Sequence, residues 1–145
     1  MTVDVTPRSF QGEVLVAGKA GSGQALVLSA PISFWGGVDP KTGTIVDVRH
    51  PEHGETIAGR VLFLPATIGS SSASAVLLEL VRNGNAPAAL VLHEPDAILL
   101  LGLIVAKEMG WFTPVAVKLD KNRFAGFADG EVSVSSDGLL ELGAG

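Results

Sequence analysis

Small hydroxyl residues gather in one short segment, residues 69–74 (GSSSAS), between the apolar run 61–65 and the helical pattern of residues 75–80. Where a buried strand passes into a helix, a serine side chain is surrounded by unpaired backbone N–H groups and by the positive end of the helix dipole. The residue types and their spacing therefore predict a turn that binds an anion, or that stabilises a serine carrying negative charge for a moment.

The structural interpretation of this segment is a helix cap. A single serine is enough for a cap, which contributes about 1 kcal/mol. The segment offers Ser70, Ser71 and Ser72 in a row after Gly69. Because three serines exceed what a helix cap requires, the segment also has a catalytic interpretation.

Three kinds of catalytic turn can be compared with the segment. A phosphate-binding Walker loop is excluded, because no Gly followed by four residues and Gly-Lys-Ser/Thr occurs in the chain. A nucleophile elbow needs Gly-x-Ser-x-Gly, but residue 73 is alanine, and His93 precedes Asp96, the reverse of the usual partner order. A serine alkoxide acting as a general base remains, and it requires helix N–H groups and nearby cations to stabilise the oxygen.

Two loop motifs upstream are further candidates. Residues 34–40 (FWGGVDP) contain Gly36, Gly37 and Asp39. In the structural interpretation, the two aromatic side chains cover an edge of the core and the two glycines form a turn. The aspartate side chain then accepts a hydrogen bond from the nearby backbone. Residues 47–53 (DVRHPEH) contain Arg49 and His50, which we expect to help bind a substrate. A metal site there is disfavoured, because two histidines in a proline-containing loop lack helical pre-organisation.

Composition excludes several classes of function. The 145 residues contain no cysteine, so the chain has no disulfide, no thiolate nucleophile and no ligands of its own for an iron–sulfur cluster. A formal charge of −5, without a Lys/Arg cluster and without tyrosine, argues against nucleic acid as a partner. The 47% hydrophobic content and the mean hydropathy of +0.42 predict that part of the surface is hidden against a partner.

Membrane insertion and secretion are not expected. The longest apolar stretch, residues 97–106, is about half the length of a membrane span and is interrupted by Gly102, so it predicts a buried helix. The first residues carry an early acid, Asp4, and no apolar segment, which argues against a secretory signal and predicts a cytoplasmic protein.

The elements predicted from periodicity form one α/β domain over residues 1–145, with residues 1–8 poorly ordered. Its centre is a three-stranded parallel unit with two crossover helices, and short antiparallel strands come from both chain ends. We expect central strands at 60–64, 88–92 and 114–117, and helices at 71–82 and 96–109, the latter capped by Asp96. We expect an opening hairpin of strands 10–18 and 24–28 around residues 21–23, a short strand at 44–48, and tail strands at 123–127, 131–135 and 139–142. Because sites in parallel units gather at the carboxyl ends of strands, residues 69–74 lie where a site is expected.

These motifs together resemble a known family. The strand followed by Gly-Ser-Ser at a helix start is similar to the turn of the swivelling domain of aconitase and isopropylmalate isomerase. Residues 29–43 (SAPISFWGGVDPKTG), 49–51 (RHP), 69–72 (GSSS) and 86–89 (APAA), with Asp47 and Gly54, resemble the small subunit of aconitase X in continuous order from about residue 11 to 117. The resemblance implies a swivelling β/β/α domain.

The resemblance also implies a function. It implies a two-chain hydro-lyase, inactive as this chain alone, whose cysteine-bearing large subunit holds an iron–sulfur cluster and most contacts to a small carboxylate substrate. Ser70 would be the general base, supported by Gly69, Ser71 and Ser72, while Gly36, Gly37 and Asp39 would approach the substrate. The aconitase turn continues with arginine and glutamate where this chain has Ser72 and Ala73, so the large subunit must supply the cation that binds the carboxylate.

The resemblance leaves three functions open. Members of the family dehydrate cis-3-hydroxy-L-proline or mevalonate 5-phosphate, and the serine turn with residues 34–37 looks more like the bacterial branch, which favours hydroxyproline. The alternative within the family is the mevalonate 5-phosphate dehydratase. The alternative of another class is a non-catalytic swivel module that docks on a partner and binds an anion.

Overall fold

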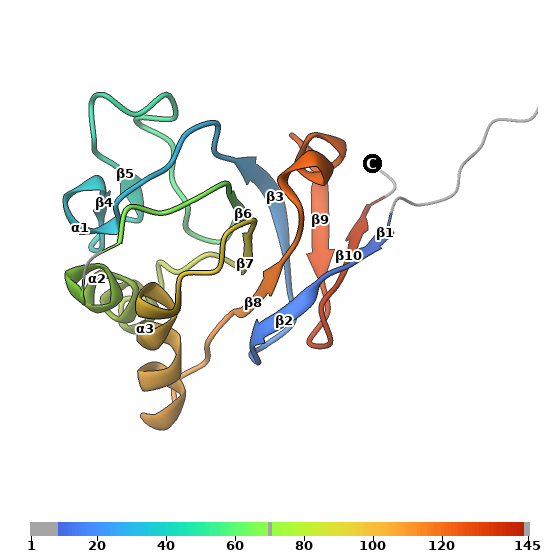
Figure 1. Ribbon diagram of the computed structural model, residues 1–145. Helices are drawn as coiled ribbons and strands as arrows, with labels where there is room; N and C mark the ends of the chain where they lie inside the picture. The colour runs from blue at the N-terminus through green and yellow to red at the C-terminus, as the bar shows by residue number, and fades with distance from the viewer. Residues whose placement is uncertain (1–8, 70, 144–145) are drawn as a thin grey trace, which may run out of the picture.

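Three apolar strands lie at the centre of the sheet, as the sequence predicts. In the computed structural model, which describes residues 9–69 and 71–143, β6 (Val61–Leu64), β7 (Ala89–Leu92) and β8 (Val115–Lys118) are neighbouring parallel strands. The expectations for residues 1–8 and for Ser70 itself lie outside the described residues. The connections contain α2 (Ser71–Arg82) and α3 (Ala97–Glu108), which lie side by side (Figure 1). The predicted parallel α/β unit is confirmed.

Strands from both chain ends extend the sheet and close it. They are β1 (Ser9–Gln11), β2 (Glu13–Val16), β3 (Gly21–Val27), β9 (Glu131–Val134) and β10 (Leu139–Leu142). The strand order is β1-β10-β9-β3-β6-β7-β8-β2. Because β1 and β2 are consecutive in the chain, the two edges of this sheet meet at Gly12, whose N–H donates to the carbonyl of Gly138 at 2.8 Å.

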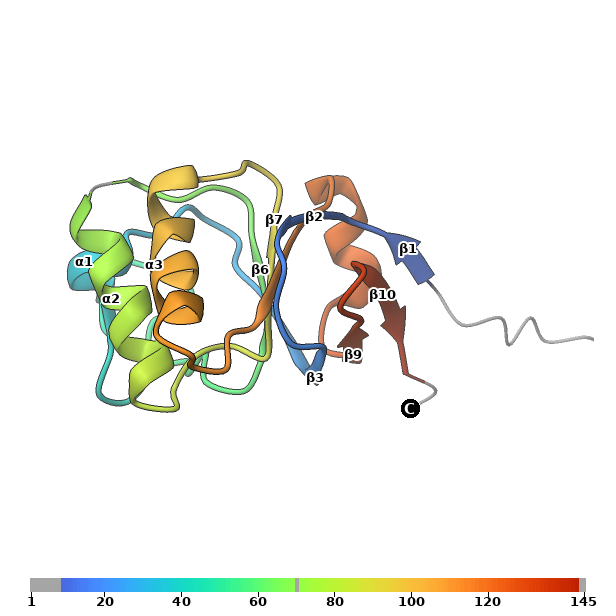
Figure 2. The same cartoon turned by 90° about the horizontal axis from the view of Figure 1, so that it is seen from below.

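Two cores separate three layers (Figure 2). The first core lies between the helices and the sheet and contains Leu77, Leu80, Leu99 and Leu103. The second lies inside the closed sheet, where the ring centroid of Phe63 is 5.2 Å from that of Phe124 and 5.6 Å from that of Phe127. The order of layers is β/β/α, which confirms the predicted architecture.

The predicted opening hairpin is wrong. β2 pairs with β8, and β3 pairs with β6 and β9, so residues 10–18 and 24–28 do not pair with each other. Residues 21–23 lie inside β3 and form no turn. A Cβ on Gly21 would lie 2.3 Å from the carbonyl oxygen of Ala88, and one on Gly23 would lie 2.2 Å from that of Gly59. These glycines therefore permit close backbone approach inside a strand.

Three further expectations are corrected. Residues 123–127 belong to the 3₁₀ helix η1 (Lys121–Phe127), whose Phe124 and Phe127 are three apart and buried together. The strand expected at 44–48 is only β5 (Thr44–Ile45), paired with β4 (Val38–Asp39). The helix over residues 97–106 is buried on one side only, because Ile98, Leu101, Ile104 and Val105 are exposed. Among residues 9–69 and 71–143, no helix is both long and apolar enough to span a bilayer.

Candidate functional site

The candidate site lies at the carboxyl ends of β6 and β7. Residues 65–69 lead from β6 to α2, and residues 93–96 lead from β7 to α3. The two loops enclose an open hollow of about 390 Å³, which is lined by Thr67, Gly69, Glu94, Pro95, Asp96, Ala97 and Ile98. This is the position that the topology of a parallel unit predicts for a site.

The described serines of the turn face solvent at the start of α2. Ser71 is the first residue of this twelve-residue helix, and Ser71 and Ser72 are exposed, as is Gly69. The hydroxyl of Ser74 donates to the carbonyl of Ser71 at 2.7 Å. Because the first N–H groups of a helix have no partner within it, this end of α2 presents donors and positive potential to the turn.

Asp96 links the two loops around the hollow. Its Oδ1 accepts from the backbone N–H of Leu99 at 3.0 Å, which confirms it as the N-cap of α3. Its Oδ2 accepts from the Thr67 hydroxyl at 2.5 Å. Both Thr67 and Asp96 are half-buried, so the link is partly shielded from water.

The segment that contains Gly36 lies beside the same turn. Ile32 forms a parallel bridge with Thr67, and the N–H of Ile68 donates to the carbonyl of Ile32 at 2.9 Å. The chain then forms the short helical turn α1 (Phe34–Gly37). Gly36 is exposed with a φ of 79°, and a Cβ there would meet no atom within 4 Å. Its backbone is therefore open to close approach.

Gly37 has a packing role instead. It is buried, and a Cβ on it would lie 3.3 Å from Cγ1 of Ile32. The N–H of Val46 donates to the Gly37 carbonyl at 2.9 Å, which joins the α1 turn to the end of β5. The two glycines that the sequence analysis groups together thus have different surroundings.

The carboxylate of Asp39 is hydrogen-bonded within its own loop. It accepts a hydrogen bond from the N–H of Lys41 at 2.9 Å. This bond to the nearby backbone is the one that the structural interpretation of the motif predicts. The side chain of Asn85 donates to the carbonyl of Lys41 at 2.8 Å, so this loop lies at the C-terminal end of α2. A helix of twelve residues is about 18 Å long, and that length separates the loop from the serine turn.

Arg49 and His50 differ in exposure. The side chain of Arg49 is 91% exposed, with Nε 3.8 Å from Asp47 Oδ1. The His50 ring is buried: Nδ1 accepts from the N–H of Glu52 at 3.1 Å, and Nε2 lies 3.1 Å from the carbonyl of Ala30. Because both ring nitrogens are engaged, His50 holds residues 30 and 52 together.

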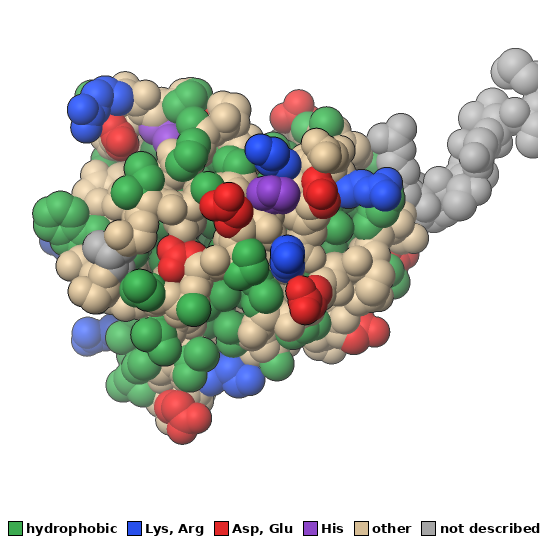
Figure 3. Space-filling model, in the orientation of Figure 1, with side chains coloured by type: hydrophobic (Ala, Val, Ile, Leu, Met, Phe, Trp, Pro, Cys, Tyr) green, Lys and Arg blue, Asp and Glu red, His purple; other side chains and the backbone are tan. Residues whose placement is uncertain are grey.

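An apolar surface runs along the outer side of α3. We call the exposed side chains of Ile98, Leu101, Ile104, Val105 and Met109 the α3 stripe; their exposed fractions are 43–55%. Hydrophobic side chains gather over this helix in the space-filling view (Figure 3). Ile98 also lines the hollow beside Gly69, so the stripe begins at the candidate site.

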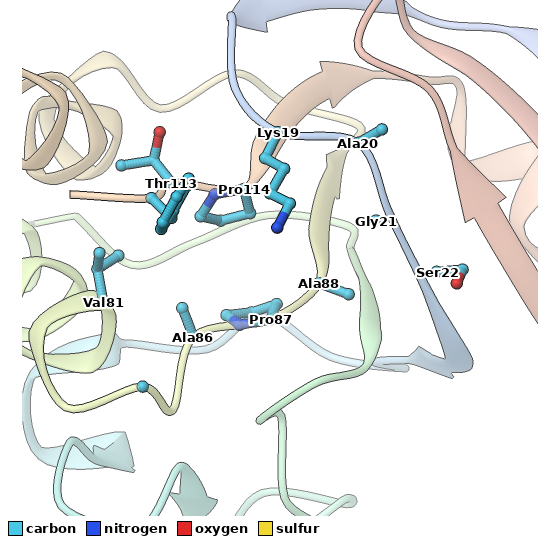
Figure 4. A pocket seen from close by; sticks show the side chains of 12 residues that line it. Lys19, Ala20, Gly21, Ser22, Val81, Ala86, Pro87, Ala88, Thr113 and Pro114 are labelled. Atoms are coloured by element: carbon cyan, nitrogen blue, oxygen red, sulfur yellow. The ribbon is translucent and has the colours of Figure 1, made fainter. Parts of the chain in front are cut away.

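A second hollow, of about 300 Å³, lies at the other end of the central strands (Figure 4). Residues 86–88 and 112–114, which precede β7 and β8, contribute to its lining. Lys19 is the charged residue of that lining, and its Nζ lies 4.9 Å from the centroid of the Phe112 ring. This hollow is separated from the serine turn by the length of the sheet.

Thr67 and Glu94 are residues of the site that the sequence analysis missed. Both follow strands at the same sheet edge, and that position was the available signal. Iron–sulfur ligation does not fit this chain, which contains no cysteine. In the two described ranges no group of three or more His, Asp or Glu side chains is arranged to hold a metal ion.

The chain is similar to aconitase X-type proteins in each comparison with known proteins. The aconitase X swivel domain model matches residues 9–142. The chain is 46% identical over 129 residues to a cis-3-hydroxy-L-proline dehydratase of Pseudomonas aeruginosa, covering 88% of this chain and 22% of the relative. It is 35% identical over 140 residues to a phosphomevalonate dehydratase small subunit of Methanosarcina acetivorans, covering 95% of this chain and 93% of the relative.

The structural comparison agrees with the sequence comparison. The crystal structure of holo aconitase X from Thermococcus kodakaraensis matches with a TM-score of 0.80 and 30% identity, covering 93% of this chain and 98% of that chain. The chain spans about a fifth of the length of the hydroxyproline dehydratases that it matches, and nearly the whole length of the Methanosarcina small subunit. From the family model, the relatives and the shared fold we conclude that the chain belongs to the aconitase X swivel domain family.

Proposed function

We propose that this chain is the smaller part of an aconitase X-type hydro-lyase and that it supplies the general base. The observation that carries the proposal is the placement of the serine turn at the carboxyl ends of β6 and β7, beside an open hollow and bridged to Ile32, which precedes the exposed Gly36 by four residues. The hollow is lined by the two loops that follow these strands and is open to solvent, which suits a site completed by a second polypeptide.

The reaction proposed is the removal of water from a hydroxylated carboxylate. Ser70 takes the proton from the carbon next to the substrate carboxylate, and the electron pair of that C–H bond forms a C=C bond. The neighbouring hydroxyl leaves with the C–O electron pair and takes up a proton to become water. The start of α2 would stabilise the deprotonated serine through its N–H groups and dipole. We assign the departure of the hydroxyl to groups of the larger polypeptide, and we place any iron–sulfur cluster there, since this chain lacks the ligands for one.

We propose cis-3-hydroxy-L-proline as the substrate. The hydroxyproline dehydratase of Pseudomonas aeruginosa is 46% identical to this chain. The charged residues of the hollow are Glu94 and Asp96, and neither lysine nor arginine is part of its lining. Two carboxylates repel a phosphate and attract the ring ammonium of an imino acid. The phosphomevalonate relatives make phosphomevalonate the second candidate substrate.

We propose that the partner covers the α3 stripe. Five large apolar side chains on one helix face cost free energy when they remain in water. The stripe starts at Ile98 on the wall of the hollow, so a polypeptide that completes the site lies next to it. This chain matches only 22% of the Pseudomonas relative, so that relative contains further polypeptide, and we propose that its counterpart covers the stripe.

Reconstitution tests this function. The chain is mixed anaerobically with the large aconitase X polypeptide of the same organism, and loss of cis-3-hydroxy-L-proline and of phosphomevalonate is measured in parallel. We expect turnover of hydroxyproline by the mixture and none by this chain alone. Turnover of phosphomevalonate instead would overturn the substrate assignment. A stable complex that dehydrates neither compound would favour the non-catalytic docking module.

A further inference from the structure

We propose that Asp96 and Thr67 are positioning residues. They hold the serine turn in the position and orientation that proton removal from the substrate requires. This inference rests on the proposed function for its catalytic consequence, but the link between the two residues is a feature of the fold. Neither residue is assigned contact with the reacting atoms.

One carboxylate, that of Asp96, bonds both to the start of α3 and to the loop after β6. Asp96 Oδ1 caps α3 through the N–H of Leu99 at 3.0 Å, which fixes the carboxylate to that helix. Asp96 Oδ2 then accepts from the Thr67 hydroxyl at 2.5 Å. A hydrogen bond to an ionised acceptor is shorter and stronger than one between neutral groups. Thr67 is thereby tied to the start of α3.

Thr67 also constrains the backbone of the serine turn. Thr67 precedes Ser70 by three residues, and a Cβ on Gly69 would lie 3.5 Å from Asp96 Oδ2. On its other side Thr67 bridges to Ile32, and the N–H of Ile68 donates to Ile32. The segment is held from two directions, and the link to Asp96 is the one that faces the hollow.

The link between Thr67 and Asp96 affects the rate of proton removal through the placement of the base. The rate of a proton transfer depends steeply on the placement of the base, and a displacement of about 1 Å can lower a rate about 100-fold. The loop is exposed at Ile68 and Gly69, so packing alone does not fix it. Loss of the link would therefore change the chemical step more than the folding of the domain.

The variant that isolates the link is Thr67→Val. It removes the hydroxyl, keeps the shape of the side chain, and leaves Asp96 free to cap α3. Thr67→Ser restores the hydroxyl. Thr42→Val is the matched control, because it removes a 3.0 Å hydroxyl contact to Thr44 in the loop near the other end of α2.

The experiment measures kcat and KM of the reconstituted enzyme with each variant, together with amide hydrogen exchange of residues 67–72. We expect Thr67→Val to lower kcat about 10- to 100-fold, to change KM less than about 3-fold, and to speed exchange in the turn. Thr67→Ser and Thr42→Val should keep kcat within about 3-fold of the wild type.

Two outcomes would overturn the proposal: a Thr67→Val enzyme with wild-type kcat, or a Thr67→Ser enzyme as slow as Thr67→Val. Failure of the proposed function is seen separately, as a wild-type complex without dehydratase activity. In that event exchange still decides whether the link orders the turn, and unchanged exchange in Thr67→Val would refute it.

Discussion

Gly102 of α3 lies directly against the Ser74 carbonyl of α2, so close that a Cβ at position 102 would be 2.5 Å from that oxygen. The same Cβ would lie 3.2 Å from the Cβ of Leu77. Ser74 lies one turn after the start of α2, so this contact sets the spacing of the two helices next to the serine turn. A glycine is required here by close approach, although its φ is not left-handed.

Gly102→Ala is predicted to destabilise the domain. In an open helix the same change stabilises by about 1 kcal/mol, but overpacking between two helices costs about 1–3 kcal/mol. The free energy of unfolding, measured with urea, is expected to fall. A stability equal to or above that of the wild type would show that a methyl group fits between α2 and α3 at this position.

The α3 stripe is predicted to carry much of the affinity for the larger polypeptide. Leu101, which is 50% exposed, lies in the middle of the stripe, and Leu101→Asp would bury a charge in the interface. We expect the dissociation constant, measured by calorimetry, to rise about 10-fold or more. Val48→Asp is the control, because Val48 is 78% exposed on the loop after β5. Equal weakening by both variants, or by neither, would place the interface elsewhere.

His50 is predicted to stabilise its loop. His50→Ala removes the two hydrogen bonds of the buried ring to the half-buried residues 30 and 52, each of which contributes about 0.5–1.5 kcal/mol to the free energy of unfolding. His53→Ala, at an exposed position of the same loop, should change stability by less than about 0.5 kcal/mol. If His50→Ala instead left stability unchanged and raised KM, His50 would be a substrate-binding residue, as the sequence analysis expects.

Gly36 is predicted to be approached closely by the substrate or by the larger polypeptide. Gly36→Asn keeps a residue that tolerates its φ of 79°, whereas Gly36→Val adds strain of about 1–2 kcal/mol. We expect both variants to lower kcat/KM, and Gly36→Asn to do so without loss of stability. A Gly36→Asn enzyme with full activity would contradict close approach.

The central unit could be predicted from the sequence because local signals there agree with the tertiary structure. The apolar runs of β6, β7 and β8 are buried on both faces, and α2 covers residues 71–82 as predicted. The prediction of an opening hairpin was wrong because Gly21 and Gly23 do not form a turn. They are glycines because the backbones of Ala88 and Gly59, which are distant in sequence, lie too close for a side chain. Periodicity contains no information on such contacts.

The sequence predicted where the candidate site lies, but only some of the residues that line it. The turn after β6 was identified from its serines, whereas the role of Thr67 depends on a partner 29 residues away. Asp39 is close in sequence to Gly36, and the loop beyond it is bonded by Asn83 and Asn85 at the far end of α2. Contacts of this kind join segments more than 40 residues apart, so the sequence pattern does not reveal them.

Replacement of Ser70 in the reconstituted enzyme tests the central claim most directly. Ser70→Ala is expected to lower kcat for cis-3-hydroxy-L-proline by roughly 10²- to 10⁴-fold, the contribution of a general base, while the affinity for the larger polypeptide stays unchanged. Ser136→Ala, at an exposed position in the β9–β10 turn, is the matched control and should retain wild-type kcat. A Ser70→Ala enzyme that dehydrates the substrate at a near-normal rate would contradict the assignment of the base to this chain.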